Sequence, residues 1–226
     1  MAHILLPATS AEDWQKHLAD PIKHWETGFS AKTLAYCWPE GGGFPGSVIT
    51  VFKKAGQPFT KLEPLLILPE HKVPLPGGKA ASQNDIWVLA RTPKDLMSIA
   101  VEGKVNEPFA DPVNDWLREG STGKEERLAF LVKTLGITLP RTSLLRYQLL
   151  HRTASAIIEA ERFRAEHAML LIHSFSPTHA WFEDFAAFVA VWGIAAERDR
   201  MHSTQLPSGR YLHFAWVHGE ERYLSK

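Results

Sequence analysis

Two short stretches, NDIWVLA at Asn84–Ala90 and MSIAVEGK at Met97–Lys104, decide how this chain folds. Their apolar and partly β-branched centres, Ile86–Ala90 and Met97–Val101, are typical of strands. Pro93–Asp95 lies between the two runs and predicts a turn. Because this connection is short, we expect the two strands to pair as an antiparallel hairpin.

Charged residues follow the second of these strands directly. Successive side chains of a strand point to opposite faces, so Glu102 and Lys104 should share one face. Asp85, at the start of the first strand, can approach that face from the neighbouring strand. Two carboxylates that converge there suit Mg²⁺, which prefers oxygen ligands, and the Gly103 carbonyl could add another oxygen. Lys104 would then orient an attacking water or stabilise the charge of a phosphate.

The alternative for the Glu102–Lys104 pair is a surface salt bridge. A Glu-x-Lys spacing is common by chance, and an exposed ion pair contributes little to stability. The apolar run before the pair argues against this alternative, because a strand buried on both faces has no structural need for charges at its end. Glu107, three residues beyond Lys104, adds a third acid nearby.

The composition fits one globular domain. Of the 226 residues, 45% are hydrophobic and 22% are charged. Lys and Arg number 25, as do Asp and Glu, and this zero balance excludes a histone-like polybasic protein but not a local basic cleft. Cys37 is the one cysteine, so an intrachain disulfide is impossible and we expect a cytoplasmic location. No apolar run approaches the roughly 18 residues that cross a membrane, so no membrane partner is expected.

Helical patterns surround the two central strands along the chain. Capping residues, prolines and closing glycines mark most of their ends. A fully buried strand is expected after the longest helix, and a last strand near the C-terminus. The expected helices are residues 11–19, 30–38, 45–52, 125–135, 143–163 and 181–192, the further strands are 65–68, 168–172 and 211–217, and residues 69–78 are expected to form a loop or an edge hairpin.

Asp85, an apolar strand, a turn, a second apolar strand and Glu102-Gly103-Lys104 together resemble the PD-(D/E)XK phosphodiesterase superfamily. The longer blocks GGKAASQND and EGKVNEPF look like an uncharacterised bacterial branch of it. The chain departs from the family pattern at Asn84, where proline is usual. The resemblance implies a mixed α/β fold with a restriction-endonuclease-like αβββαβ core at about residues 45–175. A helical cover over 1–44 and a helix–strand extension over 176–226 would complete a single domain of residues 1–226.

The long helix carries a narrow polar stripe on an otherwise apolar surface. Gln148 and Arg152 are four residues apart, and Ser155 and Glu159 continue the stripe. In several branches of the superfamily, a glutamine or a basic residue on this helix faces the active site. The resemblance therefore implies that Gln148 and Arg152 contact the scissile phosphate. The alternative is a solvated helix face, and His151 is expected to be a structural histidine.

The superfamily often adds one more glutamate from an upstream helix or strand. Glu63 and Glu70 are the candidates, and we choose Glu70 as a metal ligand because it follows the apolar run 65–68. The alternative is that Glu70 lies in a polar loop.

The resemblance implies a Mg²⁺- or Mn²⁺-dependent phosphodiesterase that cleaves nucleic acid, with DNA as the expected form. The balanced charge leaves two alternatives open. The first is a non-catalytic interaction or accessory domain that retains the nuclease fold, and the second is a hydrolase of small phosphoesters. Because the sequence has no recognisable DNA-reading module, a homodimer or a protein partner could supply specificity.

Overall fold

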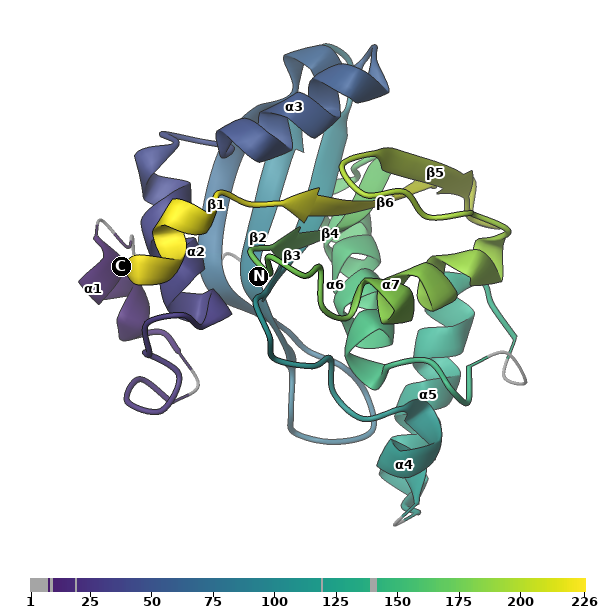
Figure 1. Cartoon of the computed structure of the whole chain (residues 1–226). Helices are drawn as coiled ribbons and strands as arrows, with labels where there is room; N and C mark the ends of the chain where they lie inside the picture. The colour runs from purple at the N-terminus through teal and green to yellow at the C-terminus, as the bar shows by residue number, and fades with distance from the viewer. Residues whose placement is uncertain (1–7, 9, 19, 119, 139–141) are drawn as a thin grey trace.

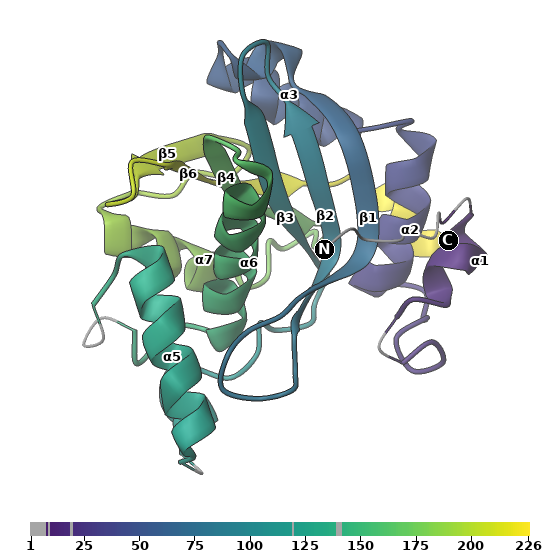
Figure 2. The same ribbon diagram turned by 180° about the vertical axis from the view of Figure 1, so that it is seen from behind.

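Apolar side chains on both faces of the central strands require helices on both sides of the sheet. The computed structural model describes residues 8, 10–18, 20–118, 120–138 and 142–226, and it shows this arrangement (Figures 1 and 2). One mixed sheet has the strand order β1-β2-β3-β4-β6-β5. Its strands are β1 (Glu63–Val73), β2 (Ser82–Arg91), β3 (Leu96–Lys104), β4 (His167–Ser174), β5 (Met201–Gln205) and β6 (Tyr211–His218).

Two hydrophobic cores lie on opposite faces of the sheet. One is formed with the N-terminal helices α1 to α3, and the other with α5, α6 and α7. Figure 1 shows the first group at α2 and α3 and the second at α6 and α7. The α-helices are α1 (Ala11–Gln15), α2 (Ser30–Glu40), α3 (Gly46–Ala55), α4 (Val113–Leu117), α5 (Thr122–Leu135), α6 (Tyr147–Phe163) and α7 (Phe182–Val189), and the short 3-10 helices are η1 (Phe59–Lys61), η3 (Ala190–Trp192) and η4 (Glu221–Ser225).

The predicted hairpin is confirmed. Strands β2 and β3 are antiparallel, with Ile86 opposite Val101. The predicted buried strand is also confirmed, because every residue of β4 is buried. This strand runs parallel to β3, which places Glu102 beside Ile172. The mixed α/β class expected from the sequence is therefore correct.

One prediction about the strands was wrong, and another holds in its second alternative. Residues 69–73 belong to β1, an edge strand that pairs antiparallel with β2, so the edge hairpin is confirmed and the loop is not. Proline is tolerated there because β1 is an edge strand, where one row of backbone groups needs no strand partner. Strand β2 begins at Ser82, although Ser82–Asp85 has the composition of a turn. Tertiary pairing with β1 overrides that local preference, and the short β5 was not predicted at all.

Several helix boundaries also differ, and the short α4 was not predicted. Helix α6 begins at Tyr147 and not at Ser143, because the chain first makes a turn in which the Leu145 N–H bonds the Thr142 carbonyl. Helix α1 ends at Gln15, whereas the expected end, Ala19, lies outside the described residues. The closing glycine of α5 is confirmed, since Gly136 adopts the left-handed conformation. No helix in the described ranges has the length and apolar character to cross a membrane.

Gly103 allows α2 to approach β3 closely. A Cβ atom at this position would lie 2.5 Å from Leu34 Cδ1 and 3.1 Å from Ser30 Cβ. We therefore expect Gly103→Ala to lower the free energy of unfolding by about 1–3 kcal/mol, the usual cost of overpacking a core. Gly46→Ala in α3 is the control, because a Cβ atom at Gly46 would meet nothing within 4 Å. Urea unfolding would measure both, and equal stabilities would contradict this account.

Candidate functional site

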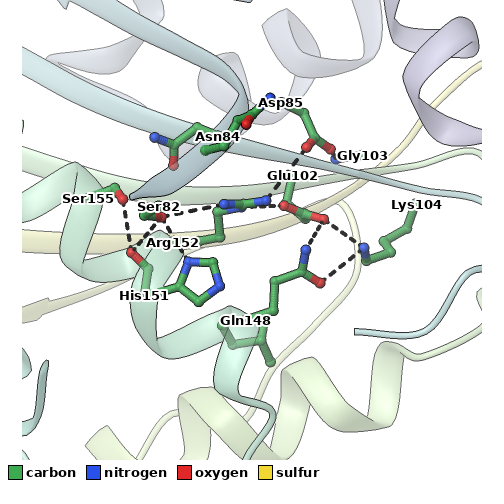
Figure 3. Close-up of polar contacts among 12 residues, drawn as sticks. Ser82, Asn84, Asp85, Glu102, Gly103, Lys104, Gln148, His151, Arg152 and Ser155 are labelled. Atoms are coloured by element: carbon green, nitrogen blue, oxygen red, sulfur yellow. Dashed lines mark hydrogen bonds and ion pairs between the residues drawn. The ribbon is translucent and has the colours of Figure 1, made fainter. Parts of the chain in front are cut away.

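The candidate site lies at the end of the central hairpin, on the face covered by α6. The paired register of β2 and β3 ends with Ile86 opposite Val101, so Asp85 and Glu102 are the next residues of the two strands and share a face. Helix α6 packs on these strands and brings Gln148 and Arg152 to the same place. Figure 3 shows the four side chains converging, together with Lys104. All five are residues that the sequence singled out.

Glu102 is the centre of this cluster and is 2% exposed. Its Oε1 accepts hydrogen bonds from Lys104 Nζ at 2.6 Å and from Gln148 Nε2 at 2.8 Å. Its Oε2 accepts one from Arg152 Nε at 2.6 Å. Gln148 Oε1 also accepts a bond from Lys104 Nζ at 3.3 Å, so the Gln148 amide contacts both Lys104 and Glu102. An ionised carboxylate has about four acceptor positions, and three are used here.

Asp85 and Glu70 are the acids with fewer positive partners. Asp85 Oδ2 accepts a bond from the Gly103 N–H at 2.7 Å, and its Oδ1 lies 3.8 Å from Arg152 Nη2. Glu70 Oε2 accepts a bond from Gln83 Nε2 at 2.7 Å. Glu70 has a φ of 54° in the middle of β1, a strained conformation of the kind that clusters at functional sites.

The pKa values of these acids move in opposite directions. Burial and the nearby charge of Glu102 raise the pKa of Asp85 to about 7. Burial and the charge of Asp85 raise that of Glu70 to about 8. Burial also acts to raise the pKa of Glu102, but Arg152 and Lys104 outweigh it and lower the value to about 2. Glu102 is therefore ionised near neutral pH. Asp85 and Glu70 have too few cationic partners to offset the cost of burying their charge.

A cavity of about 460 Å³ opens onto this cluster. Glu70, Asp85, Glu102 and Arg152 line it, and so does Gln83. Lys104 and Gln148 lie behind Glu102 and are not part of this lining. The Lys104 ammonium, 3% exposed, also lies over the Phe109 ring. The structure therefore brings Glu70, Asp85, Glu102 and Arg152 to one surface and places the lysine in a second layer.

Glu107 has a structural role in the described contacts. Its Oε1 accepts a bond from the Ser30 N–H at 2.7 Å, and its Oε2 accepts one from the Val105 N–H at 2.9 Å. The carboxylate thus caps α2, which has no capping side chain of its own at Phe29. Glu107 reaches the cavity wall with both oxygens engaged.

Sequence reasoning missed two polar neighbours of the cluster, Gln83 and Ser82. Ser82 Oγ lies 3.4 Å from Arg152 Nη1 and 2.8 Å from His151 Nδ1. Burial and the neighbouring Arg152 charge hold the pKa of His151 well below its usual value, which fits the expected structural histidine. The only sequence signal was that Ser82 and Gln83 precede Asp85 in what proves to be the same strand.

The acids fit a hard divalent cation by their chemistry. Among the described residues, no group of three or more His, Cys, Asp and Glu side chains has the arrangement of a metal site. Mg²⁺ needs fewer protein ligands, because it keeps several waters and is usually bound by one or two carboxylates. Burial and the neighbouring acids raise the pKa values of Asp85 and Glu70, and a bound cation would favour the ionised form of both.

The fold and the site define a mixed α/β domain with a buried acid–base cluster beside an open cavity. The chain belongs to a family described as a domain of unknown function (DUF6946), whose model matches residues 7–221. Searches of curated proteins and of solved structures returned no match.

Proposed function

We propose that this protein is a metal-dependent phosphodiesterase that cleaves nucleic acid, with DNA as the first candidate. The observation that carries the proposal is the convergence of Asp85, Glu102 and Arg152 at one cavity, with Lys104 bonded to Glu102 behind it. A buried cluster of four charges is costly to assemble, because each charge loses its hydration. In several proteins, replacing such a cluster by apolar residues makes the fold more stable. Such a cost is common where a site performs chemistry.

The topology supports a restriction-endonuclease-like core. A helix, α3, precedes three antiparallel strands, and α6 leads to a fourth strand that is parallel to β3. Although α4 and α5 also lie between β3 and α6, this order is compatible with the αβββαβ core that we propose. The acid of the first motif lies on the second strand, and Glu102 and Lys104 end the third.

In the proposed reaction, Asp85 and Glu102 would hold the cation, and Glu70 lines the same cavity. When bound, Mg²⁺ or Mn²⁺ would neutralise phosphate charge and favour ionisation of the attacking water. Arg152 donates from its guanidinium to a non-bridging phosphate oxygen, since it already lines the cavity. Lys104 positions the attacking water after its side chain turns toward the cavity. Gln148 holds Lys104 and Glu102 in place, as its two hydrogen bonds imply.

The direct test is a calorimetric titration with Mg²⁺ and Mn²⁺, followed by a cleavage screen with plasmid, single-stranded DNA and RNA. We expect millimolar or tighter binding and metal-dependent cleavage that EDTA abolishes. Asp85→Asn should lose both, because the amide can keep the bond from the Gly103 N–H but carries no charge. Asp115→Asn, at an exposed acid, is the control. Cleavage of every substrate at the wild-type rate by Asp85→Asn would refute the proposal.

We expect metal binding to strengthen as the pH rises from 6 to 9. Asp85 and Glu70, with pKa values of about 7 and 8, hold protons near neutrality that a cation must displace. Calorimetry in two buffers of different ionisation enthalpy should show release of about one proton per metal ion near pH 7.5. An affinity that does not change over this range would contradict the raised pKa values.

One observation favours the alternative of a non-catalytic domain that retains the fold. Lys104 is almost fully buried and bonded to Glu102 at 2.6 Å, as in a structural ion pair. In that case, Lys104 would affect folding stability and no reaction would depend on it. The Lys104 variants considered in the Discussion separate the two functions.

A further inference from the structure

The cavity has a second wall, which the proposed mechanism does not use. Opposite the strands, it is lined by residues that precede α2, namely Leu18, Lys23, His24 and Phe29, and by the first residues of α2. The sheet side carries the acids. The opposite side carries two basic side chains and an aromatic ring, so the two walls differ in chemistry.

Phe29 is an exposed aromatic residue within this wall. It precedes the first turn of α2 and is 46% exposed. Its ring packs on no other aromatic ring in the described part of the chain. An apolar ring left open beside a cavity is a surface on which a flat ligand can stack, and a nucleic-acid base is such a ligand.

Lys23 and His24 lie in a turn that Asp20 organises. Asp20 Oδ1 accepts hydrogen bonds from the N–H groups of Ile22 and Lys23, at 3.1 and 2.9 Å. This turn sets the two basic side chains on the cavity wall, and both residues are exposed. Asp20 also interacts electrostatically with both side chains. The Lys23 ammonium and the hydrogen-bonding ring of His24 suit a phosphate next to the one that lies at the acids.

We propose that this wall binds single-stranded nucleic acid, with an unpaired base stacked on Phe29 and a phosphate near Lys23 and His24. This inference rests on the proposed function and names its substrate class. A duplex keeps its bases stacked within the helix, so only an unpaired base can reach the ring. The cavity volume of about 460 Å³ also lies in the range of sites that enclose a small ligand.

The test measures binding apart from cleavage. Fluorescence anisotropy of a labelled oligo-dT, with Ca²⁺ in place of Mg²⁺, should show much tighter binding than a duplex of equal length. Phe29→Ala should weaken binding of the single strand about 5- to 150-fold, the usual effect of losing one stacked base. Phe29→Trp should retain it. Ile22→Ala is the matched control, because Ile22 is 88% exposed and does not line the cavity.

The outcomes separate this inference from the proposed function. If the duplex binds as tightly as the single strand, or if Phe29→Ala binds like Ile22→Ala, the inference is wrong even where the protein cleaves DNA. If the single strand binds through Phe29 but no metal ion supports cleavage, the inferred binding site is supported and the proposed hydrolysis is refuted. In an active enzyme, Phe29→Ala should raise KM and leave kcat nearly unchanged.

Discussion

Lys104→Met should reduce the kcat of nucleic-acid cleavage about 100- to 1,000-fold, the effect of losing one fixed donor to the developing charge. Methionine keeps most of the apolar stem but has no ammonium to position water. The KM and the metal affinity should change little, because Asp85, Glu70 and Arg152 still line the cavity. Steady-state cleavage of a labelled oligonucleotide would measure both parameters.

Lys104→Arg and Gln148→Ala complete this test. Arginine restores the charge but is larger than the buried space beside Phe109, so we expect only partial activity. Gln148→Ala should lower kcat less than Lys104→Met does, since it removes a positioning contact of 3.3 Å. Cleavage within threefold of wild type in Lys104→Met, combined with lower stability, would show that Lys104 is structural and takes no part in the reaction. A wild-type protein that cleaves no substrate, together with lower stability of Lys104→Met, would support the non-catalytic alternative.

Glu102→Gln should have the largest effect on stability. It leaves the charges of Lys104 and Arg152 buried without their shared counterion, which typically costs about 3–5 kcal/mol. Both oxygens of Glu102 accept charged hydrogen bonds at 2.6 Å, so neither contact survives unchanged. Denaturant unfolding, monitored by tryptophan fluorescence, would measure the loss.

The exposed pair of Glu63 and Arg91 provides the control. Its atoms lie 2.7 Å apart, but both side chains are more than half exposed. Glu63→Gln should therefore cost less than about 1 kcal/mol. The joint replacement of Glu102 by Leu and of Lys104 and Arg152 by Met should recover stability relative to Glu102→Gln, because no buried cation is left without a counterion. Similar losses for Glu63→Gln and Glu102→Gln would contradict the central role of Glu102.

The hairpin could be predicted because its signals are local. Apolar runs, a proline turn and the alternation of side chains suffice to place Glu102 and Lys104 on one face. The stripe on α6 follows from helical periodicity, but only the resemblance to the superfamily implied that Gln148 and Arg152 face the site. The end of β1 and the start of β2 were not predictable in this way. Their polar and proline residues favour turns, and only pairing between the two strands makes them extended.

The sequence by itself determined the residue types, the strand pair and the shared face of Glu102 and Lys104, since these depend on neighbours along the chain. The tertiary structure decided which charges meet. The β2–β3 pairing brought Asp85 to the end of β3, where it accepts a bond from the Gly103 N–H, and a long β1 carried Glu70 to the cavity. The packing of α6 placed Arg152 against Glu102. These contacts join residues far apart in the chain, so their energies depend on register and packing that no local pattern specifies.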